Sequence, residues 1–321
     1  MAKEIYESLS DISEKFDAFL FDLWGTIWNG TEFYNGALDL MTGLRRRGKI
    51  VYILSNYSQV EWISMQDYGN LGMYQNTHYD EFVTSGQVAH DILKGKKIGG
   101  KQINLGLNGT KFYNLGRPNK DLFAFTSYQQ VTNPKNANFF YIGYLALSQT
   151  EFSELSADQK QFVHAQPYGK SFYILKDLGP FMPKLNALLD LKLPLFSANP
   201  DMTFCVNQQG KSIEAIAQGM ASKKYKEMGG TVIEIGKPYS IIYDYVLDRM
   251  QAKGRRPYKR RIAMVGDTVR TDVAGAKNAG LASILVIGDG VTAKELANGA
   301  TLSDIFKREK AKPDYIIRHV R

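Results

Sequence analysis

The sequence predicts an α/β protein with a parallel-sheet core and a smaller α/β domain inserted into that core. Short apolar runs rich in β-branched and aromatic residues alternate with helical patterns near the amino end, and the same alternation returns near the carboxyl end. The segment between them is richer in Asn, Lys and aromatic residues. Alternating strands and helices give parallel sheets, so the two ends of the chain are expected to form halves of one sheet.

The first half of the core is expected from four alternating segments. The apolar run at 16–22 predicts a strand, and the pattern at 36–48 predicts a helix. A second strand is expected at 49–56 and a second helix at 58–72. This order predicts that the two strands lie parallel to each other.

The second half of the core repeats the same rhythm. Strands are expected at 231–238, 260–267, 281–290 and 313–320, with helices at 240–254 and 269–280.

The segment between the halves has elements of its own. Strand patterns lie at 138–147, 171–177 and 193–200, and a helical pattern lies at 179–192. We therefore expect a Rossmann-like core domain formed by residues 1–84 and 201–321, with an inserted α/β domain at 85–200.

The composition is that of an ordinary globular protein, with 44% hydrophobic and 22% charged residues in a chain of 321. Cys205 is the one cysteine, which excludes an intrachain disulfide. Residues 1–19 are too polar for a secretory signal, and no apolar run is long enough to cross a bilayer. We expect a cytoplasmic protein without a membrane partner.

The net charge of +8 is spread over separate basic clusters, at 45–47, 94–97, 254–261 and 307–312. Such runs are typical of solvated faces, and no nucleic-acid-binding motif accompanies them. We expect no nucleic-acid partner, whereas a small phosphorylated ligand is compatible with the charge. The sequence leaves open whether the chain forms a homodimer.

Four predicted core strands end on polar residues, and these ends are the main functional signal. Asp22 ends the first, Ser55 and Asn56 the second, Lys237 a third and Asp267 a fourth. A single Asp or Ser after a strand is most often a helix N-cap. In open parallel sheets, however, ligands bind outside the carboxyl ends of the strands, so four complementary ends predict one shared site.

The chemistry of these residues fits phosphoryl transfer. Asp22 can act as a carboxylate nucleophile that forms an aspartyl-phosphate. Asp267 offers a hard oxygen ligand for Mg²⁺. Ser55 can donate its hydroxyl to a phosphate oxygen, and Lys237 brings a positive charge to oxygens that gain charge in the transition state.

With these residues in place, the chain resembles the haloacid dehalogenase-like (HAD) hydrolase superfamily. Its four motifs stand in order as DLWGT (22–26), LSN (54–56), GKP (236–238) and GDTVRTD (266–272). Only 33 residues separate Asp22 from Ser55, whereas 182 separate Ser55 from Lys237, so the cap domain follows the second motif. With VTSGQVA at 83–89 and SANPD at 197–201, this arrangement is similar to subfamily II-A, which includes nucleotide monophosphatases, p-nitrophenylphosphatase-like enzymes and sugar-phosphate phosphatases.

The resemblance implies a Mg²⁺-dependent phosphatase or phosphotransferase that acts on a small phosphorylated metabolite. Asp22 would be the nucleophile and a metal ligand, with the backbone carbonyl of Trp24 and the carboxylate of Asp267 as further ligands. Asp272 would contact the metal through a water molecule, or would contact the residues that bind the metal directly. Ser55 and Lys237 would hold the phosphate, with Asn56 beside it. Specificity would come from cap closure, with Asn199 and Asp201 as pocket candidates.

Trp24 departs from the family pattern. Phosphatases of this superfamily usually carry an Asp there, which protonates the leaving oxygen and then activates water. Three interpretations follow: a phosphatase that works without this acid, a module that binds phosphorylated ligands without turnover, and a haloacid dehalogenase, which also carries an aromatic residue at this place. The cap position and Asp267 argue against the dehalogenase, and the intact Asp22, Ser55 and Lys237 argue against complete loss of chemistry.

Overall fold

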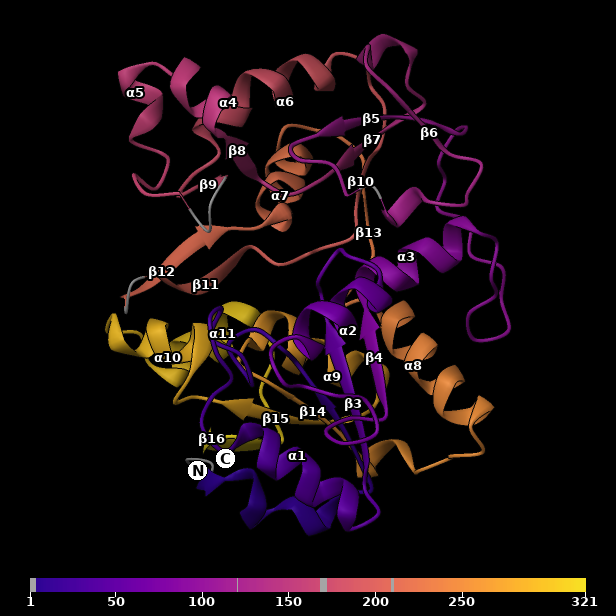
Figure 1. Ribbon diagram of the computed structural model, residues 1–321, viewed down its shortest axis with the longest axis vertical. Coiled ribbons are helices and arrows are strands. Elements are labelled where there is room, and N and C mark those ends of the chain that lie inside the picture. The colour runs from indigo at the N-terminus through magenta and orange to yellow at the C-terminus, as the bar shows by residue number, and fades with distance from the viewer. Residues whose placement is uncertain (1–3, 120, 168–171, 209–210) are drawn as a thin grey trace.

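A computed structural model describes residues 4–119, 121–167, 172–208 and 211–321 (Figure 1). Its core is a seven-stranded sheet in the order β1-β16-β15-β14-β2-β3-β4, and every neighbouring pair is parallel. The strands are β1 (Ile5–Ser8), β2 (Ala18–Phe21), β3 (Ile50–Ser55), β4 (Glu81–Thr84), β14 (Ile262–Gly266), β15 (Ala282–Val286) and β16 (Tyr315–His319). The predicted α/β class with a parallel core sheet is confirmed, and the two ends of the chain do form halves of one sheet.

Helices cover both faces of this sheet. They are α1 (Ala37–Arg46), α2 (Glu61–Gly69), α3 (Ser85–Leu93), α8 (Ser240–Ala252), α9 (Ala274–Ala279), α10 (Gly290–Ala297) and α11 (Leu302–Glu309). Alternate strand residues point to opposite faces: Leu20 and Leu54 pack in the cluster that includes α8 and α9, whereas Phe21 and Ile53 pack in the cluster that includes α1. The strands read as continuous apolar runs because both faces are buried.

A second, five-stranded parallel sheet lies beyond the carboxyl ends of the core strands (Figure 1). Its order is β13 (Val232–Glu234), β10 (Leu195–Ser197), β7 (Phe139–Ile142), β5 (Lys111–Leu115) and β6 (Gln129–Val131). Two antiparallel pairs accompany it: β8 (Ala146–Ser148) with β9 (Phe172–Ile174), and β11 (Thr203–Gln208) with β12 (Lys211–Ile216). Its helices are α4 (Gln149–Glu154), α5 (Ala157–Lys160), α6 (Met182–Leu189) and α7 (Gln218–Glu227).

Short helical turns complete the described chain. They are η1 (Leu9–Asp11), η2 (Ser13–Lys15), η3 (Asp121–Phe123), η4 (Pro134–Asn136), η5 (Gly179–Phe181), η6 (Lys259–Arg261) and a π-helical turn, η7 (Val269–Val273). Within the described ranges, no helix is both long and apolar enough to span a membrane.

The strand expected at 231–238 does not join the core sheet, and this prediction is wrong. Its middle forms β13, which pairs with β10 in the second sheet, so that Ile233 lies opposite Phe196. A short apolar run indicates a strand but not the sheet that the strand joins. The domain limits themselves, 1–84 and 201–321 around 85–200, stay a prediction, although the second sheet takes β13 from the segment expected in the core.

Candidate active site

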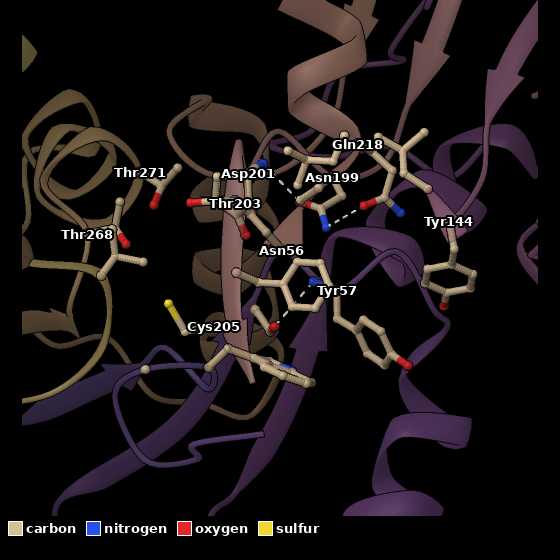
Figure 2. Close-up of a pocket in the computed structure, with 18 of the residues that line it drawn as sticks. Asn56, Tyr57, Tyr144, Asn199, Asp201, Thr203, Cys205, Gln218, Thr268 and Thr271 are labelled. Atoms are coloured by element: carbon tan, nitrogen blue, oxygen red, sulfur yellow. Dashed lines mark hydrogen bonds between the residues drawn. The ribbon is translucent and has the colours of Figure 1, made fainter. Parts of the chain in front are cut away.

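A cavity of about 340 Å³ lies between the core sheet and the second sheet. Core loops supply one wall, and the antiparallel pairs β8-β9 and β11-β12, with the loops near them, supply the other. In Figure 2, Tyr57 and Tyr144 lie on one side of this cavity, and Thr268 and Thr271 lie on the opposite side. Its lining includes Asp22, Trp24, Gly25, Ser55, Asn56, Tyr57, Arg117, Tyr144, Leu145, Ala146, Phe172, Ile174, Asn199, Asp201, Thr203, Phe204, Cys205, Ile216, Ala217, Gln218, Asp267, Thr268, Thr271, Gly290 and Val291.

Asp22 lies at the carboxyl end of β2, between β14 and β3. Phe21, the residue before it, pairs with Val265 of β14 on one side and with Ile53 of β3 on the other. The Asp22 backbone N–H donates to the carbonyl oxygen of Val265 over 2.8 Å. This register places the ends of β2, β3 and β14 next to each other, which brings Ser55 and Asp267 to the same site as Asp22.

Three carboxylates meet at this point. Asp22, Asp267 and Asp272 each offer an oxygen that lies within 4.8 Å of the others. Burial, then the charge of Asp22, raises the pKa of Asp267 well above its usual range. Burial likewise raises the pKa of Asp272 to about 7, although the nearby Lys237 opposes the shift. Hard oxygen donors with uncompensated negative charge fit a divalent cation.

Lys237 is the buried countercharge of this cluster. Its ammonium Nζ lies 2.6 Å from Asp22 Oδ1 and 2.7 Å from Asp272 Oδ1, and the residue is 1% exposed. Burial opposes its positive charge, but Asp22 and Asp272 outweigh burial and raise its pKa. Lys237 is not part of the described cavity lining, and its ammonium group reaches the site through its contacts with Asp22 and Asp272.

Asn56 holds the backbone of Lys237. Its Oδ1 accepts the Lys237 N–H over 2.6 Å, and its Nδ2 donates to the Lys237 carbonyl over 3.0 Å and to Asp201 Oδ1 over 2.9 Å. An amide nitrogen carries two donors, so both donors of Asn56 are already used. A phosphate contact by this side chain stays a prediction. The observed role of Asn56 is to position Lys237, which arrives from the second sheet rather than from a core strand.

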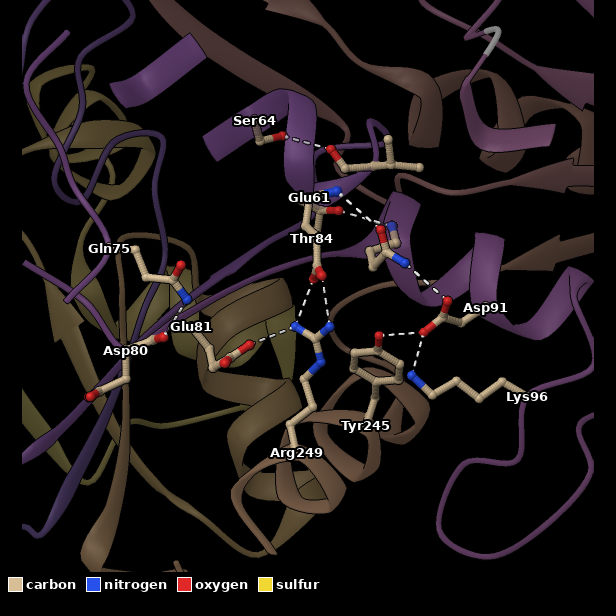
Figure 3. Close-up of polar contacts among 12 residues, drawn as sticks. Glu61, Ser64, Gln75, Asp80, Glu81, Thr84, Asp91, Lys96, Tyr245 and Arg249 are labelled. Carbon is tan, nitrogen blue, oxygen red and sulfur yellow. Dashed lines mark hydrogen bonds and ion pairs between the residues drawn. The ribbon is translucent and has the colours of Figure 1, made fainter. Parts of the chain in front are cut away.

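Ser55 ends β3 and lies in the cavity wall. Its Oγ accepts the N–H of Tyr57 over 3.2 Å, which leaves the hydroxyl hydrogen available for a ligand. The loop that follows is anchored at its far end by Glu61, the first residue of α2. Both Glu61 carboxylate oxygens lie 2.7 Å from guanidinium nitrogens of Arg249, which also bonds Glu81 over 2.8 Å (Figure 3).

Asp267 and Asp272 are held by backbone donors. Val291 N–H donates to Asp267 Oδ2 over 2.5 Å, and Thr268 N–H donates to Asp272 Oδ2 over 3.0 Å. Gly25 and Gly290 have φ of +80° and +72°, and a Cβ on either would collide with the Asp267 carboxylate. Glycine is therefore required at both positions. The other Asp267 oxygen, Oδ1, makes only long contacts of 3.4–3.5 Å with threonine hydroxyls, so it is open to a ligand.

Trp24 lies in the cavity wall and packs against the β11–β12 hairpin. Its ring meets Phe204 edge to face at a centroid distance of 5.8 Å. Both rings pack on a small cluster of Ile174, Val206 and Ala215. At the position where the family resemblance predicts a carboxylic acid, this chain has an apolar contact between the core loop and the hairpin.

Asn199 and Asp201 both line the cavity, and their role as substrate contacts stays a prediction. The Asn199 side chain is already bonded: Nδ2 donates to Gln218 Oε1 over 2.9 Å, and Oδ1 accepts the Asp201 N–H over 2.9 Å. Burial raises the pKa of Asp201, although Lys237 opposes the shift.

Several cavity residues escape prediction from the sequence. Tyr57, Tyr144, Phe172 and Phe204 give the cavity its aromatic walls, and Arg117 adds a positive charge. The aromatic run at 138–147 could equally be the core of the inserted domain, and a lone arginine in a loop has no pattern. Of these residues, Tyr57 could have been predicted to lie near the site, because it directly follows the second motif in the sequence.

Two family models match the two segments that carry the site. A model described as haloacid dehalogenase-like hydrolase matches residues 19–113, and one described as HAD-hydrolase-like matches residues 234–321. The chain belongs to the haloacid dehalogenase-like hydrolase superfamily. Both the predicted family and the predicted class, a HAD-type hydrolase, are confirmed.

Curated relatives match over most of the chain. Phosphoglycolate phosphatase 2 of Arabidopsis thaliana is 24% identical over 328 residues, which covers 98% of this chain and 95% of the relative. The chloroplastic phosphoglycolate phosphatase 1A of the same plant is 24% identical over 315 residues, with 91% and 74% covered.

Solved structures share the fold along nearly the whole chain. A haloacid dehalogenase-like hydrolase from Brucella suis 1330 has a TM-score of 0.73 and 21% identity, and the match covers 99% of this chain and 100% of that one. The 4-nitrophenylphosphatase of Thermotoga maritima has a TM-score of 0.57 and 21% identity, with 96% of each chain covered. These matches agree with the predicted subfamily II-A.

Proposed function

We propose that the chain is a Mg²⁺-dependent phosphatase that acts on a small phosphorylated metabolite through an aspartyl-phosphate at Asp22. The observation that carries this proposal is the meeting of the carboxylates of Asp22, Asp267 and Asp272, two of which, Asp22 and Asp272, bond the ammonium group of Lys237. The curated relatives, which are phosphoglycolate phosphatases, and the solved 4-nitrophenylphosphatase support the same reaction class.

In this proposal the metal is held by Asp22, by the backbone carbonyl of Trp24 and by Asp267. When bound, Mg²⁺ neutralises the carboxylates and the phosphate so that the two anions can approach each other. Asp272 stays behind these ligands, because both of its oxygens already accept hydrogen bonds, from Lys237 and from the Thr268 backbone. The negative charge of Asp272 favours the protonated form of Lys237, in agreement with the raised pKa of Lys237.

The reaction then has two steps. A carboxylate oxygen of Asp22 forms a bond to phosphorus while the ester P–O bond breaks and the leaving oxygen takes the electron pair. Water next attacks the aspartyl-phosphate, which releases phosphate and restores Asp22. Ser55 and Lys237 stabilise the phosphoryl oxygens as their charge grows. Because position 24 holds no acid, the leaving oxygen departs as an anion or takes its proton from another group.

Trapping the intermediate tests the proposal. The protein is mixed with acetyl phosphate or 4-nitrophenyl phosphate and Mg²⁺, quenched in acid and analysed by peptide mass spectrometry. We expect phosphate on Asp22, release of inorganic phosphate, and neither in Asp22→Asn, because an amide is a poor nucleophile. Undiminished turnover by Asp22→Asn would remove Asp22 from the mechanism.

Trp24 favours a second candidate, a module that binds phosphorylated ligands without turnover. Beryllium fluoride distinguishes the two functions, because it mimics the aspartyl-phosphate only on a competent nucleophile. An Asp22 adduct together with phosphate release supports the phosphatase, whereas ligand binding without either supports the module. A cytoplasmic location and the oligomeric state stay outside this proposal.

A further inference from the structure

The cavity is strongly asymmetric in charge. Its acidic residues, Asp22, Asp201 and Asp267, belong to the end where the phosphate and the metal are proposed to bind. In the described part of the chain, Arg117 is the one cationic residue of the lining, and it comes from the loop that follows β5. In Figure 2, Tyr144, whose backbone pairs with that of Arg117, lies on the side of the cavity opposite Thr268, the neighbour of Asp267, so a substrate that reaches from Asp22 to Arg117 passes from a phosphate-binding end to a second anion-binding end.

Arg117 is fixed in position by its backbone. Its N–H donates to the carbonyl of Tyr144 over 2.9 Å, and the Tyr144 N–H donates back to the Arg117 carbonyl over 2.9 Å. A Cβ on Gly143 would collide with this Arg117 carbonyl, and a Cβ on Gly116 would collide with the Tyr144 carbonyl. The close approach of these two loops requires both glycines, so the arginine is presented by a rigid frame.

The guanidinium of Arg117 has a stacking partner but no ion pair. Its central carbon lies 3.1 Å from the centroid of the Phe172 ring. No described carboxylate lies within 4.0 Å of it, and burial lowers the pKa of Arg117. Stacking occupies the face of a guanidinium and leaves the N–H edge free, which is the edge that binds a carboxylate through two parallel hydrogen bonds.

Aromatic side chains form the walls between the two ends. Tyr57, which follows the second motif, places its ring 6.1 Å from that of Tyr144, and Trp24 and Phe204 form the other aromatic pair of the lining. Against these flat rings a flat apolar ligand buries more apolar surface than a polyhydroxylated one, because hydroxyls that face the rings lose water without gaining hydrogen bonds.

We propose that the preferred substrate is a phosphomonoester with a flat, apolar body and a carboxylate at the end remote from the phosphate, and that Arg117 binds this carboxylate. This inference rests on the proposed phosphatase function for its catalytic part and names the substrate class of that site. Arg117 determines specificity and takes no part in bond cleavage.

An isosteric pair of substrates tests whether Arg117 binds a carboxylate of the substrate. The compounds are 4-phosphonooxybenzoate and 4-phosphonooxybenzamide, which differ in charge but hardly in shape. Wild-type protein is expected to have a kcat/KM about tenfold to a hundredfold higher for the benzoate, the range of a charge-assisted hydrogen bond in a partly buried site. The amide withdraws more electron density and is the better leaving group, so chemical reactivity works against this preference.

Substitutions of Arg117 test whether this residue causes the preference for the benzoate. Arg117→Met keeps a long side chain over Phe172 without the charge, and it should lose the preference while turnover of the benzamide changes less than threefold. Arg117→Lys should retain part of the preference. Arg256→Gln, on a different cavity at the opposite end of the core strands, is the control and should match wild type. Equal kcat/KM for both compounds in wild type, or an unchanged preference in Arg117→Met, overturns the inference.

A binding measurement separates this inference from the proposed function. The non-hydrolysable analogues 4-(phosphonomethyl)benzoate and its amide are titrated into wild type and Arg117→Met by calorimetry with Mg²⁺ present. Tighter binding of the benzoate analogue by wild type alone supports the role of Arg117 even if no ester is hydrolysed, in which case only the phosphatase proposal fails. Equal binding of the two analogues by wild type overturns the role of Arg117 whatever the turnover.

Discussion

Replacement of Trp24 by Asp should restore an acid to the leaving group. The present chain has no carboxyl group at this position, so we expect its kcat/KM to fall steeply as the pKa of the leaving group rises. Aryl and acyl phosphates should be turned over far better than alkyl esters such as sugar phosphates. In Trp24→Asp the dependence should flatten, because the new acid helps most where the leaving oxygen most needs a proton.

The expected gain can be compared with the cost in packing. A positioned acid typically contributes about 10²- to 10⁴-fold, or roughly 3–5 kcal/mol of barrier for poor leaving groups. Removing a fully buried large ring costs about 3–5 kcal/mol of stability. Trp24 is only partly buried, and among the described residues its aromatic contact is the edge-to-face pair with Phe204, so a loss on the order of 2 kcal/mol is expected. A domain of ordinary stability remains folded after such a loss.

The assay measures kcat/KM over a series of aryl and alkyl phosphates at saturating Mg²⁺. Trp24→Asn is the matched control, because Asn has nearly the volume of Asp and loosens the hairpin equally but donates no acidic proton. Trp24→Asp should exceed Trp24→Asn on alkyl esters and equal it on the most acidic leaving groups. Equal rates for the two variants on every ester would show that loss of the ring, rather than gain of an acid, changed the activity.

A flat dependence in wild type would refute this account of Trp24. If alkyl phosphates are already cleaved as fast as aryl ones, another group supplies the proton. Asp201 is the first candidate, because it lines the cavity and burial raises its pKa, which favours the protonated form. Asp201→Asn would then lower the rates of alkyl esters much more than those of aryl esters.

Three further predictions concern the charge cluster. Lys237→Met should lower kcat/KM by at least 10²-fold, and unchanged kinetics would mean that the third motif is placed wrongly. Chelation with EDTA should abolish phosphate release, and Mg²⁺ should restore it with a rise in Tm; activity that survives chelation would exclude the metal role. The raised pKa values of Asp267 and Asp272 mean that the folded, metal-free protein holds more protons than the unfolded chain between about pH 4 and 7. Its stability should therefore fall as pH rises through that window, and the rise in Tm with Mg²⁺ should be larger at pH 8 than at pH 5, as thermal melts at both values would test.

Much of the core could be predicted because its signals are local. Strands buried on both faces are continuous apolar runs, and parallel neighbours bring their carboxyl ends together. Asp22, Ser55 and Asp267 therefore converge as expected, at the ends of the adjacent strands β2, β3 and β14. The relation among these three residues follows from strand order alone, without any detail of side-chain packing.

The remaining features depend on contacts that no sequence window contains. The run before Lys237 predicts a strand, but only its pairing with β10 places it in the second sheet. The position of Asn56 after the second motif gives no sign that its amide bonds the backbone of Lys237, 181 residues away. Arg117 becomes noticeable only because the cavity around it holds no other described cation.

Trp24 and Arg117 select the same class of substrate by different physical effects, and this can be tested in one double-mutant cycle. The absence of an acid at position 24 favours aryl leaving groups, and the aromatic walls and the charge of Arg117 favour an aryl body with a remote anion. The residue at position 24 decides whether the leaving oxygen receives a proton, whereas Arg117 binds the far end of the ligand. Trp24 pairs with Phe204 and Arg117 stacks on Phe172, so the two side chains have different aromatic partners. Changes at sites without shared partners add to within about 0.5 kcal/mol, so for 4-phosphonooxybenzoate the effects of Trp24→Asp and Arg117→Met on kcat/KM should multiply to within about twofold or threefold. A larger deviation would mean that both residues act through one element, and β9 would be the element to examine, because its Phe172 stacks on Arg117 and its Ile174 belongs to the cluster that packs on Trp24.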